Sequence, residues 1–190
     1  MSRDELAEQI RLCQEGHSEA FSWLLEEYGP RLYRYFLRVS GSEADAEDLL
    51  QNLFVKLLEK IQGYSHQAKF EHWLFRVAAN LTRDRARRQS LRKTLSLHST
   101  DDRQQSLADT LASGEMEPVD HLQQAEKIDA LQKALAQLPE VDREIILLRH
   151  YGQWTFKEIA EHYEMPVGTA LAKVHRGLKR LQRIMTKDEK

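Results

Sequence analysis

Apolar residues recur every three or four positions along most of this chain, and this period predicts α-helices. The clearest signals lie near the C-terminus. Thr155 and Glu158 have the T-x-x-E spacing of a capping box, so a helix should begin at Phe156. A second helix is predicted over about 167–185, because Pro166 interrupts the first and cannot continue it. Two short helices joined by a tight break indicate a helix-turn-helix.

The second of these helices has two sides of different character. One side is an apolar stripe that should face the core. This stripe consists of Val167, Ala170, Leu171, Val174, Leu178, Leu181 and Met185. The other side is cationic, without an acidic residue from Gly168 to Met185. A cationic run alone is more often a solvated face, but the capping box and the break favour duplex DNA. Because the first turns of such a helix meet base edges, the predicted base contacts are Thr169, Lys173 and Arg176, and the predicted phosphate contacts are Lys179, Arg180 and Arg183.

The N-terminal half also predicts helices. Ser18 is a candidate cap, Gly29-Pro30 should break or kink the helix that follows, and Gly41 should end it. Ser42 then opens another helix whose first turns are acidic. The helix dipole favours acidic side chains at this end, so the cluster has a structural explanation, and it also permits a protein-binding face.

A basic stretch from Lys69 to Lys93 is a second candidate for nucleic acid. Its aromatic residues alternate with arginines, a pattern that suits single-stranded DNA. Helical spacing favours a core position for Phe70, Trp73 and Leu74, whereas Phe75 should point away from the apolar stripe. The predicted contacts are Tyr64, His66, His72, Phe75, Arg76, Asn80, Arg83 and Arg87. If His66, Phe75 and Asn80 were all buried, no nucleotide could be held here.

Charge alternates in sign along the chain and suggests its domains. The net charge of all 190 residues is only −2, but residues 1–68 carry −5, 69–93 carry +6, 94–130 carry −6 and 131–190 carry +3. Local basic blocks, rather than the total, attract phosphate. We expect an all-α protein with two small helical domains, 1–93 and 128–190, joined by a flexible acidic linker, 94–127. That linker is either held along a partner or a disordered, solvated tether.

Composition limits the remaining functions. No apolar run approaches the roughly 20 residues of a membrane span, and the N-terminus predicts an amphipathic helix capped by Ser2 and Glu5 instead of a signal peptide. We therefore expect a cytoplasmic protein. The single cysteine, Cys13, cannot form an internal disulfide and should be buried. Since no nucleophile–base set, metal-ligand spacing or phosphate-binding glycine loop is present, we expect neither an enzyme nor a cofactor or metal.

Two stretches resemble one known family. DAEDLLQNLFVKLLEKI followed by KFEHWLFRVAANLTRDRARR is similar to region 2 of bacterial RNA polymerase sigma factors. LPEVDREIILLRHYGQWTFKEIAEHYEMPVGTALAKVHRGLKRL is similar to region 4. The absence of a folded region between them resembles the extracytoplasmic-function (ECF) group.

The resemblance implies partners and positions. Core RNA polymerase would bind the helix 45–58 through its clamp helices, with contacts at Asp48, Gln51, Asn52 and Phe54. The loop from Gly63 to Lys69 would accept a base flipped out of the melted non-template strand of the minus-ten element, and region 4 would bind the duplex minus-thirty-five element. Many relatives also have an anti-sigma partner. Promoter recognition, DNA melting and transcription initiation would follow.

The chain departs from the family pattern at two places. Gln51-Asn52 stands where the family commonly has Gln-Glu, and Leu171, Ala172 and Lys173 stand where relatives often place a basic residue, Ser and Arg. Because lysine lacks the bidentate fork of arginine, we expect loose reading of the minus-thirty-five element. One alternative stays open: a helix-turn-helix regulator that binds duplex operator DNA, as a dimer, without joining polymerase.

Overall fold

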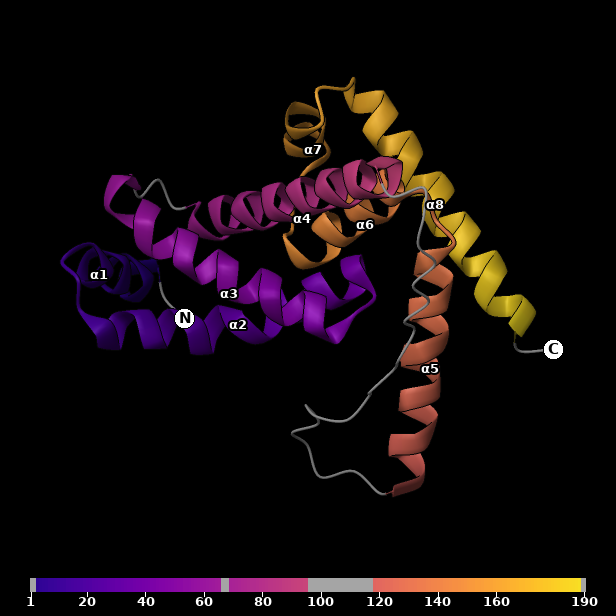
Figure 1. The fold of residues 1–190 in the computed structure, drawn as a ribbon, viewed down its shortest axis with the longest axis horizontal. Helices are drawn as coiled ribbons and strands as arrows, with labels where there is room; N and C mark the ends of the chain where they lie inside the picture. Colours follow the sequence, from indigo (N-terminus) through magenta and orange to yellow (C-terminus); the bar gives the residue numbers. More distant parts are fainter. Residues whose placement is uncertain (1–2, 66–68, 96–117, 189–190) are drawn as a thin grey trace. The chain divides into compact units, whose positions relative to one another are not determined.

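The computed structural model describes residues 3–65, 69–95 and 118–188, and the regular structure in these ranges is entirely helical (Figure 1). The elements are α1 (Arg3–Gln14), α2 (Ser18–Ser40), α3 (Glu43–Lys60), the 3-10 helix η1 (Ile61–Gly63), α4 (Phe70–Leu95), α5 (Pro118–Ala136), α6 (Glu140–Tyr151), α7 (Phe156–His162) and α8 (Val167–Asp188). The predicted all-α fold is confirmed. None of these helices is long and apolar enough to cross a membrane. Ser2 and His66 lie outside the described residues.

The chain forms two compact units, each with its own apolar core. The first is built on α1 to α4 and takes in Leu147–Trp154, and the second is built on α5, the start of α6, α7 and α8. Helix α5 begins at Pro118, inside the stretch 94–127 in which we expected no sustained helix. That expectation is wrong for residues 118–127. The fixed φ of proline suits the first position of a helix, and Pro118 occupies that position in α5.

Helices α2 and α3 pack side by side as an antiparallel hairpin in the first unit (Figure 1). Gly41 ends α2 in the left-handed conformation, with φ of 76°, and its N–H donates to Leu37 O at 2.9 Å. Ser42 caps α3, because its side chain accepts a hydrogen bond from the backbone N–H of Asp45 at 3.3 Å. Both predicted boundaries are confirmed. At the start of α2 the cap residue is His17 instead of Ser18, and its side chain makes no capping hydrogen bond.

The predicted break at Gly29-Pro30 is absent, and α2 continues through both residues. A proline ring clashes with the Cβ of the residue before it when that residue is helical. Gly29 has no Cβ, so this clash does not arise. Tyr28 and Leu32 on either side are buried, with 5% and 0% exposure. Burial of these large side chains offsets the one backbone hydrogen bond that proline removes.

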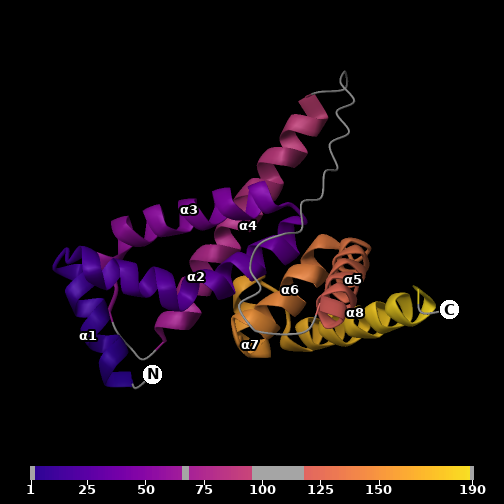
Figure 2. The same cartoon turned by 90° about the horizontal axis from the view of Figure 1, so that it is seen from below.

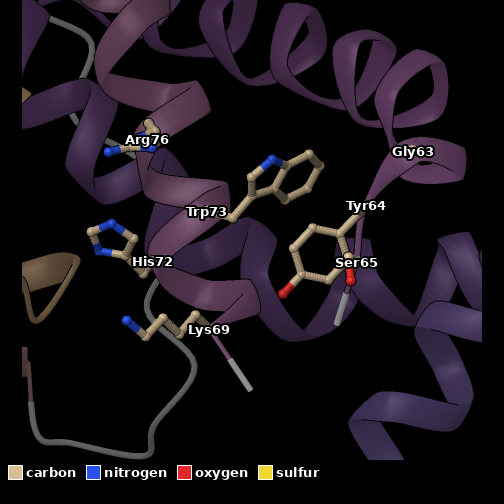
Figure 3. Close-up of a pocket in the computed structure, with 7 residues that line it drawn as sticks. All are labelled: Gly63, Tyr64, Ser65, Lys69, His72, Trp73 and Arg76. Atoms are coloured by element: carbon tan, nitrogen blue, oxygen red, sulfur yellow. The ribbon is translucent and has the colours of Figure 1, made fainter. Parts of the chain in front are cut away.

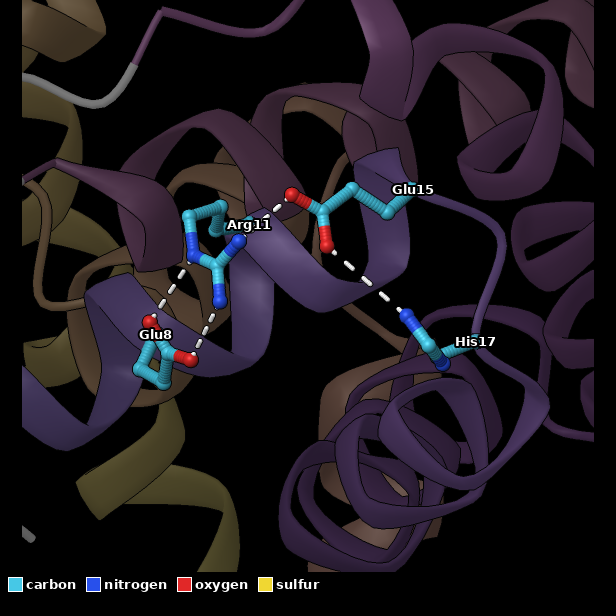
Figure 4. Close-up of polar contacts among 4 residues, drawn as sticks. All are labelled: Glu8, Arg11, Glu15 and His17. Carbon is cyan, nitrogen blue, oxygen red and sulfur yellow. Dashed lines mark hydrogen bonds and ion pairs between the residues drawn. The ribbon is translucent and has the colours of Figure 1, made fainter.

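Helix α1 packs on α2 with Ile10 and Cys13 buried, and its outer face carries a chain of charged groups (Figure 4). Arg11 donates to both carboxylate oxygens of Glu8, at 3.0 and 2.6 Å, and to Glu15 at 2.5 Å. His17 Nε2 lies 3.7 Å from the Glu15 carboxylate. The hydrogen bond from Arg11 lowers the pKa of the Glu8 carboxyl. Because these groups are solvent-exposed, the network contributes little to stability.

The second unit contains the predicted helix-turn-helix, in which α7 packs on α8 (Figure 2). The capping box is present in full. Thr155 Oγ1 accepts from Glu158 N at 3.2 Å, and the Glu158 carboxylate accepts from Thr155 N at 2.8 Å. Glu164 then turns the chain with φ of 52° before α8 begins. Helix starts at Phe156 and Val167 are therefore confirmed.

The buried side of α8 is narrower than the predicted apolar stripe. Ala170, Val174 and Leu181 are buried, but Val167, Leu171 and Leu178 are each about half exposed, at 50%, 52% and 50%. The prediction that these three face the core is wrong. Gly177 lies on the buried side instead, where a Cβ would come within 2.6 Å of Ile146 Cδ1 on α6. Because α6 and α8 approach closely at Gly177, the buried side of α8 runs through Ala170, Gly177 and Leu181.

Candidate nucleic-acid interfaces

A pocket of about 300 Å³ lies where η1 gives way to α4 (Figure 3). Its lining residues are Gly63, Tyr64, Ser65, Lys69, His72, Trp73 and Arg76. The rings of Tyr64 and Trp73 lie together at one side, with centroids 4.8 Å apart. Lysine, arginine and histidine side chains surround the remainder. A base can stack on an aromatic ring while cationic groups attract its phosphate, so this pocket has the chemistry of a site for an unstacked nucleotide.

The fold holds the aromatic wall in place from two directions. The side-chain amide of Gln14, at the end of α1, donates to Ile61 O at 2.9 Å and to Tyr64 O at 2.7 Å. The ring of Phe70 contacts Tyr64, with centroids 5.4 Å apart, and also Tyr28 on α2, at 5.6 Å. Burial raises the pKa of the Tyr28 phenol to about 12, so this side chain is a neutral packing group. The pocket wall is therefore ordered before any ligand arrives.

Several predicted single-strand contacts form one exposed strip on α4. The strip begins at the pocket with the partly exposed Trp73 and continues through Arg76, Asn80, Arg83 and Arg87, all exposed. Their spacings of three and four residues place them on one side of the helix. His72 and Tyr64 are half-buried in the pocket wall. The structure thus gathers six predicted residues with Trp73 on one surface, while His66 lies outside the described residues.

Phe75 is the predicted contact that the structure removes from this surface. Its side chain has 0% exposure, contrary to the expectation that it points away from the core. Its ring packs on Tyr35 of α2, with centroids 5.6 Å apart, and the Arg31 guanidinium lies 5.3 Å from its centroid. Helix α4 is buried on a wide arc because both α2 and α3 pack against it. A single apolar stripe was therefore the wrong template for this helix, and no base reaches Phe75.

Trp73 and two polar residues of the pocket were not predicted as contacts. We expected Trp73 in the core with Phe70 and Leu74, and only the latter two are buried there, at 1% exposure each. Ser65 and Lys69 line the pocket and belong to the predicted loop from Gly63 to Lys69, but they were not singled out as contacts. Helical spacing could not separate Trp73 from the core residues, since it shares their period. The sequence signal that could have identified Trp73 was its place between Lys69 and Arg76, shortly after the loop that carries Tyr64.

Helix α8 presents the predicted duplex-binding face in the second unit. Arg176, Lys179, Arg180 and Arg183 are exposed, and Thr169 is half-buried in the first turns. Lys173 differs from them. Its ammonium is 2.6 Å from the Asp142 carboxylate of α6, and the two side chains are only 26% and 15% exposed. A partly buried ion pair of this kind is costly to break, which argues against the predicted base-reading role of Lys173.

Helix α3 turns an amphipathic surface outward along the first unit. Ala46, Leu49, Leu53 and Leu57 form its buried side. Of the predicted polymerase contacts, Asp48, Gln51 and Asn52 are exposed and Phe54 is half-buried. Val55 and Leu58 continue the same outward side with 53% and 51% exposure. Val55 and Leu58 thus add apolar area to the second half of a surface that is otherwise polar.

Comparison with known proteins identifies both halves of the chain. Residues 24–92 match the family Sigma-70 region 2, and residues 128–181 match Sigma-70, region 4. The chain is 30% identical to the RNA polymerase sigma factor CarQ of Myxococcus xanthus over 90% of this chain and 92% of that protein. It is 26% identical to the ECF RNA polymerase sigma factor SigW of Bacillus subtilis over 94% of this chain and 95% of that protein.

Solved structures show the same fold. The sigma factor RpoE of Bartonella quintana, in complex with the anti-sigma factor NepR, has a TM-score of 0.68 and 22% identity, covering 87% of this chain and 96% of that one. CnrH, in complex with the cytosolic domain of CnrY, has a TM-score of 0.62 and 19% identity, covering 95% and 96%.

Two family matches in this order decide between the alternatives left open by the sequence. An operator-binding regulator accounts for the second match and leaves the first unexplained. The chain is a polymerase-binding sigma factor, and it belongs to the ECF group of the sigma-70 family. Such proteins are transcription initiation factors.

Proposed function

We propose that this sigma factor divides promoter recognition between the two interfaces described above, with residues 1–93 and 128–190 as the working domains. Region 2 holds core polymerase on α3 and captures an unstacked base of the minus-ten element in the pocket at the start of α4. Region 4 binds the minus-thirty-five duplex through α8. The observation that carries the proposal is the pocket itself. Tyr64 and Trp73 line it together with Lys69 and Arg76, and the exposed strip on α4 begins there.

In the minus-ten interface, Trp73 and Tyr64 provide the stacking surface for the flipped base. Lys69 and Arg76 are exposed beside them and attract the adjoining phosphates. Asn80, Arg83 and Arg87 then follow the non-template strand along α4, with His72 at the edge of the pocket. His66, outside the described residues, stays a predicted contact of this interface. Phe75 has no part in this interface because it is buried.

In the minus-thirty-five interface, Thr169 and Arg176 face base edges, and Lys179, Arg180 and Arg183 hold phosphates. Lys173 instead supports the recognition helix through Asp142. Core polymerase binds the outward side of α3 at Asp48, Gln51, Asn52 and Phe54, and the exposed Val55 and Leu58 extend that surface. We further propose that the protein acts as a binding subunit and not as an enzyme, and that it works in the cytoplasm with polymerase.

Energetics indicate that melting needs polymerase. Opening DNA costs about 1.4 kcal/mol per base-pair step, and stacking returns about 1–3 kcal/mol per captured base. A pocket that holds one base therefore cannot sustain a bubble of several pairs. Since RpoE of Bartonella quintana was solved with an anti-sigma factor, we include an anti-sigma protein among the partners of this chain.

The test is a Trp73→Ala variant assayed with core polymerase. Loss of the stacking ring should lower the equilibrium constant for open-complex formation about 5- to 150-fold, the equivalent of one stacked base. Core binding, measured by fluorescence anisotropy, should not change, because α3 is untouched. Open complexes can be quantified on a promoter selected from a genomic fragment library by run-off transcription.

Trp23→Ala is the matched control. Trp23 is also partly exposed and lies in region 2, but on α2 and outside the pocket. Both variants lose a tryptophan, so their shared loss of stability is subtracted. Equal open-complex formation by the two variants would contradict the assignment of the pocket.

A further inference from the structure

Apolar side chains occupy the first turns of α8, where polar base contacts were expected. Val167 and Leu171 lie one turn apart and are 50% and 52% exposed. Leu171 belongs to an exposed strip with Gly168, His175 and Lys179, which are spaced three and four residues apart. Around Gly168 no atom lies within 4 Å of an added Cβ, so nothing in the described structure covers the helix surface beside Leu171.

Neither side chain belongs to the buried side of α8. The core side of α8 is filled by Ala170, Val174 and Leu181, with Gly177 against Ile146. A single exposed leucine is ordinary. Val167 and Leu171 are branched apolar residues on successive turns of a helix that also exposes Arg176, Lys179, Arg180 and Arg183. Such a surface suits an apolar group carried on a polyanion.

The major groove offers one such group on its base edges. The 5-methyl of thymine is the apolar feature by which a side chain distinguishes T·A from the other base pairs. Lys179 and Arg180 lie further along the helix and are exposed, which places the proposed phosphate contacts beyond the apolar pair. Lys173, the nearest basic side chain to Leu171 in sequence, is engaged by Asp142 at 2.6 Å.

We propose that Leu171, assisted by Val167, is a specificity-determining residue that selects thymine in the minus-thirty-five element through its 5-methyl group. This inference rests on the proposed role of α8 in duplex binding. The proposal replaces our expectation that the minus-thirty-five element is read loosely. Leu171 and Ala172 stand where the resemblance led us to expect hydrogen-bond donors, and an apolar contact to a methyl group takes their place.

The experiment uses the holoenzyme formed from this chain and core polymerase. Promoter duplexes are selected from a library randomised across the minus-thirty-five region, and thymine should be enriched at one or more positions. Each enriched thymine is then replaced by deoxyuridine, which removes the methyl and leaves every hydrogen-bonding atom. Loss of one buried methyl should weaken binding about three- to fourfold, since a buried carbon of this size contributes about 0.8 kcal/mol.

Leu171→Ala should abolish the difference between thymine and uracil. Leu178→Ala is the matched control, because Leu178 is equally exposed, at 50%, but lies two turns further along α8, where phosphates are expected. The control should keep the full three- to fourfold preference. Both residues are half exposed, so neither substitution should unfold the domain.

Three outcomes would overturn the inference, and they differ in whether the proposed function survives. Equal affinity for thymine and uracil at every position leaves the proposed function intact and removes only methyl reading. A Leu171→Ala variant that loses core polymerase, or loses both DNAs equally, assigns Leu171 to a protein contact or to general binding. A wild-type holoenzyme that selects no sequence removes the proposed function and this inference with it.

Discussion

At the residue scale, exposure decides which chemically suitable side chains a nucleic acid could reach. Trp73 and Phe75 are two residues apart and both aromatic, yet Trp73 lines the pocket and Phe75 has 0% exposure. From the sequence we expected the opposite, with Trp73 in the core and Phe75 exposed. The sequence offers only residue type and helical period. Because α4 is packed on two sides, it has no single apolar stripe that shows which side chains point toward the core. The exposed arginines of α4 were predictable because charge restricts a side chain to the surface.

Cys13 provides a residue-scale prediction about ionisation. It is 2% exposed, and burial raises the pKa of its thiol to about 11 from 9.0. Because the thiolate is the reactive form, a pKa raised by two units leaves about a hundredfold less thiolate at pH 8. Native protein should therefore react with iodoacetamide at least about a hundredfold more slowly than urea-unfolded protein, and the rate should rise up to about pH 11. A native rate equal to that of the unfolded chain would show that Cys13 is accessible.

At the scale of elements, capping signals predicted helix ends more reliably than apolar stripes predicted helix faces. The boundaries at Ser42 and Phe156 follow from capping hydrogen bonds that the sequence specifies, and the start of α8 at Val167 follows directly after Pro166. The faces of α8 depend on how closely α6 approaches at Gly177, which is a property of two helices far apart in sequence. Helix α2 shows the same dependence on packing between helices. It continues through Pro30, which locally favours a break, because the side chains around Pro30 are buried.

Gly41 provides an element-scale prediction. Its φ of 76° lies in the left-handed region, where a Cβ costs about 1–2 kcal/mol. Gly41→Ala should destabilise the α2–α3 hairpin by about 1 kcal/mol, measured as a lower urea midpoint of the helical circular dichroism signal. Gly41→Asn is the control at the same position, because asparagine tolerates this conformation better than alanine. The expected order of stability is Gly, Asn, Ala, and an alanine variant as stable as the asparagine variant would refute the conformational explanation.

At the scale of the whole molecule, we propose that two small domains divide promoter recognition between them. The family was predictable from two motifs in the right order, because each motif encodes local helical structure. The pocket was predictable only as a loop with aromatic and basic neighbours, since its wall depends on Gln14 reaching Ile61 and Tyr64 about fifty residues further along the chain. Both interfaces are cationic surfaces of limited size, so their combined use depends on a partner that holds promoter and protein together.

The most direct test of this account is permanganate footprinting of the minus-ten region, in which unpaired thymines react. The account predicts reactive thymines when this chain and core polymerase are both present, and none with either component alone, because capture of one base cannot offset the opening of several pairs. Reactive thymines produced by this chain without polymerase, or unreactive thymines in a complex that contains both, would contradict it.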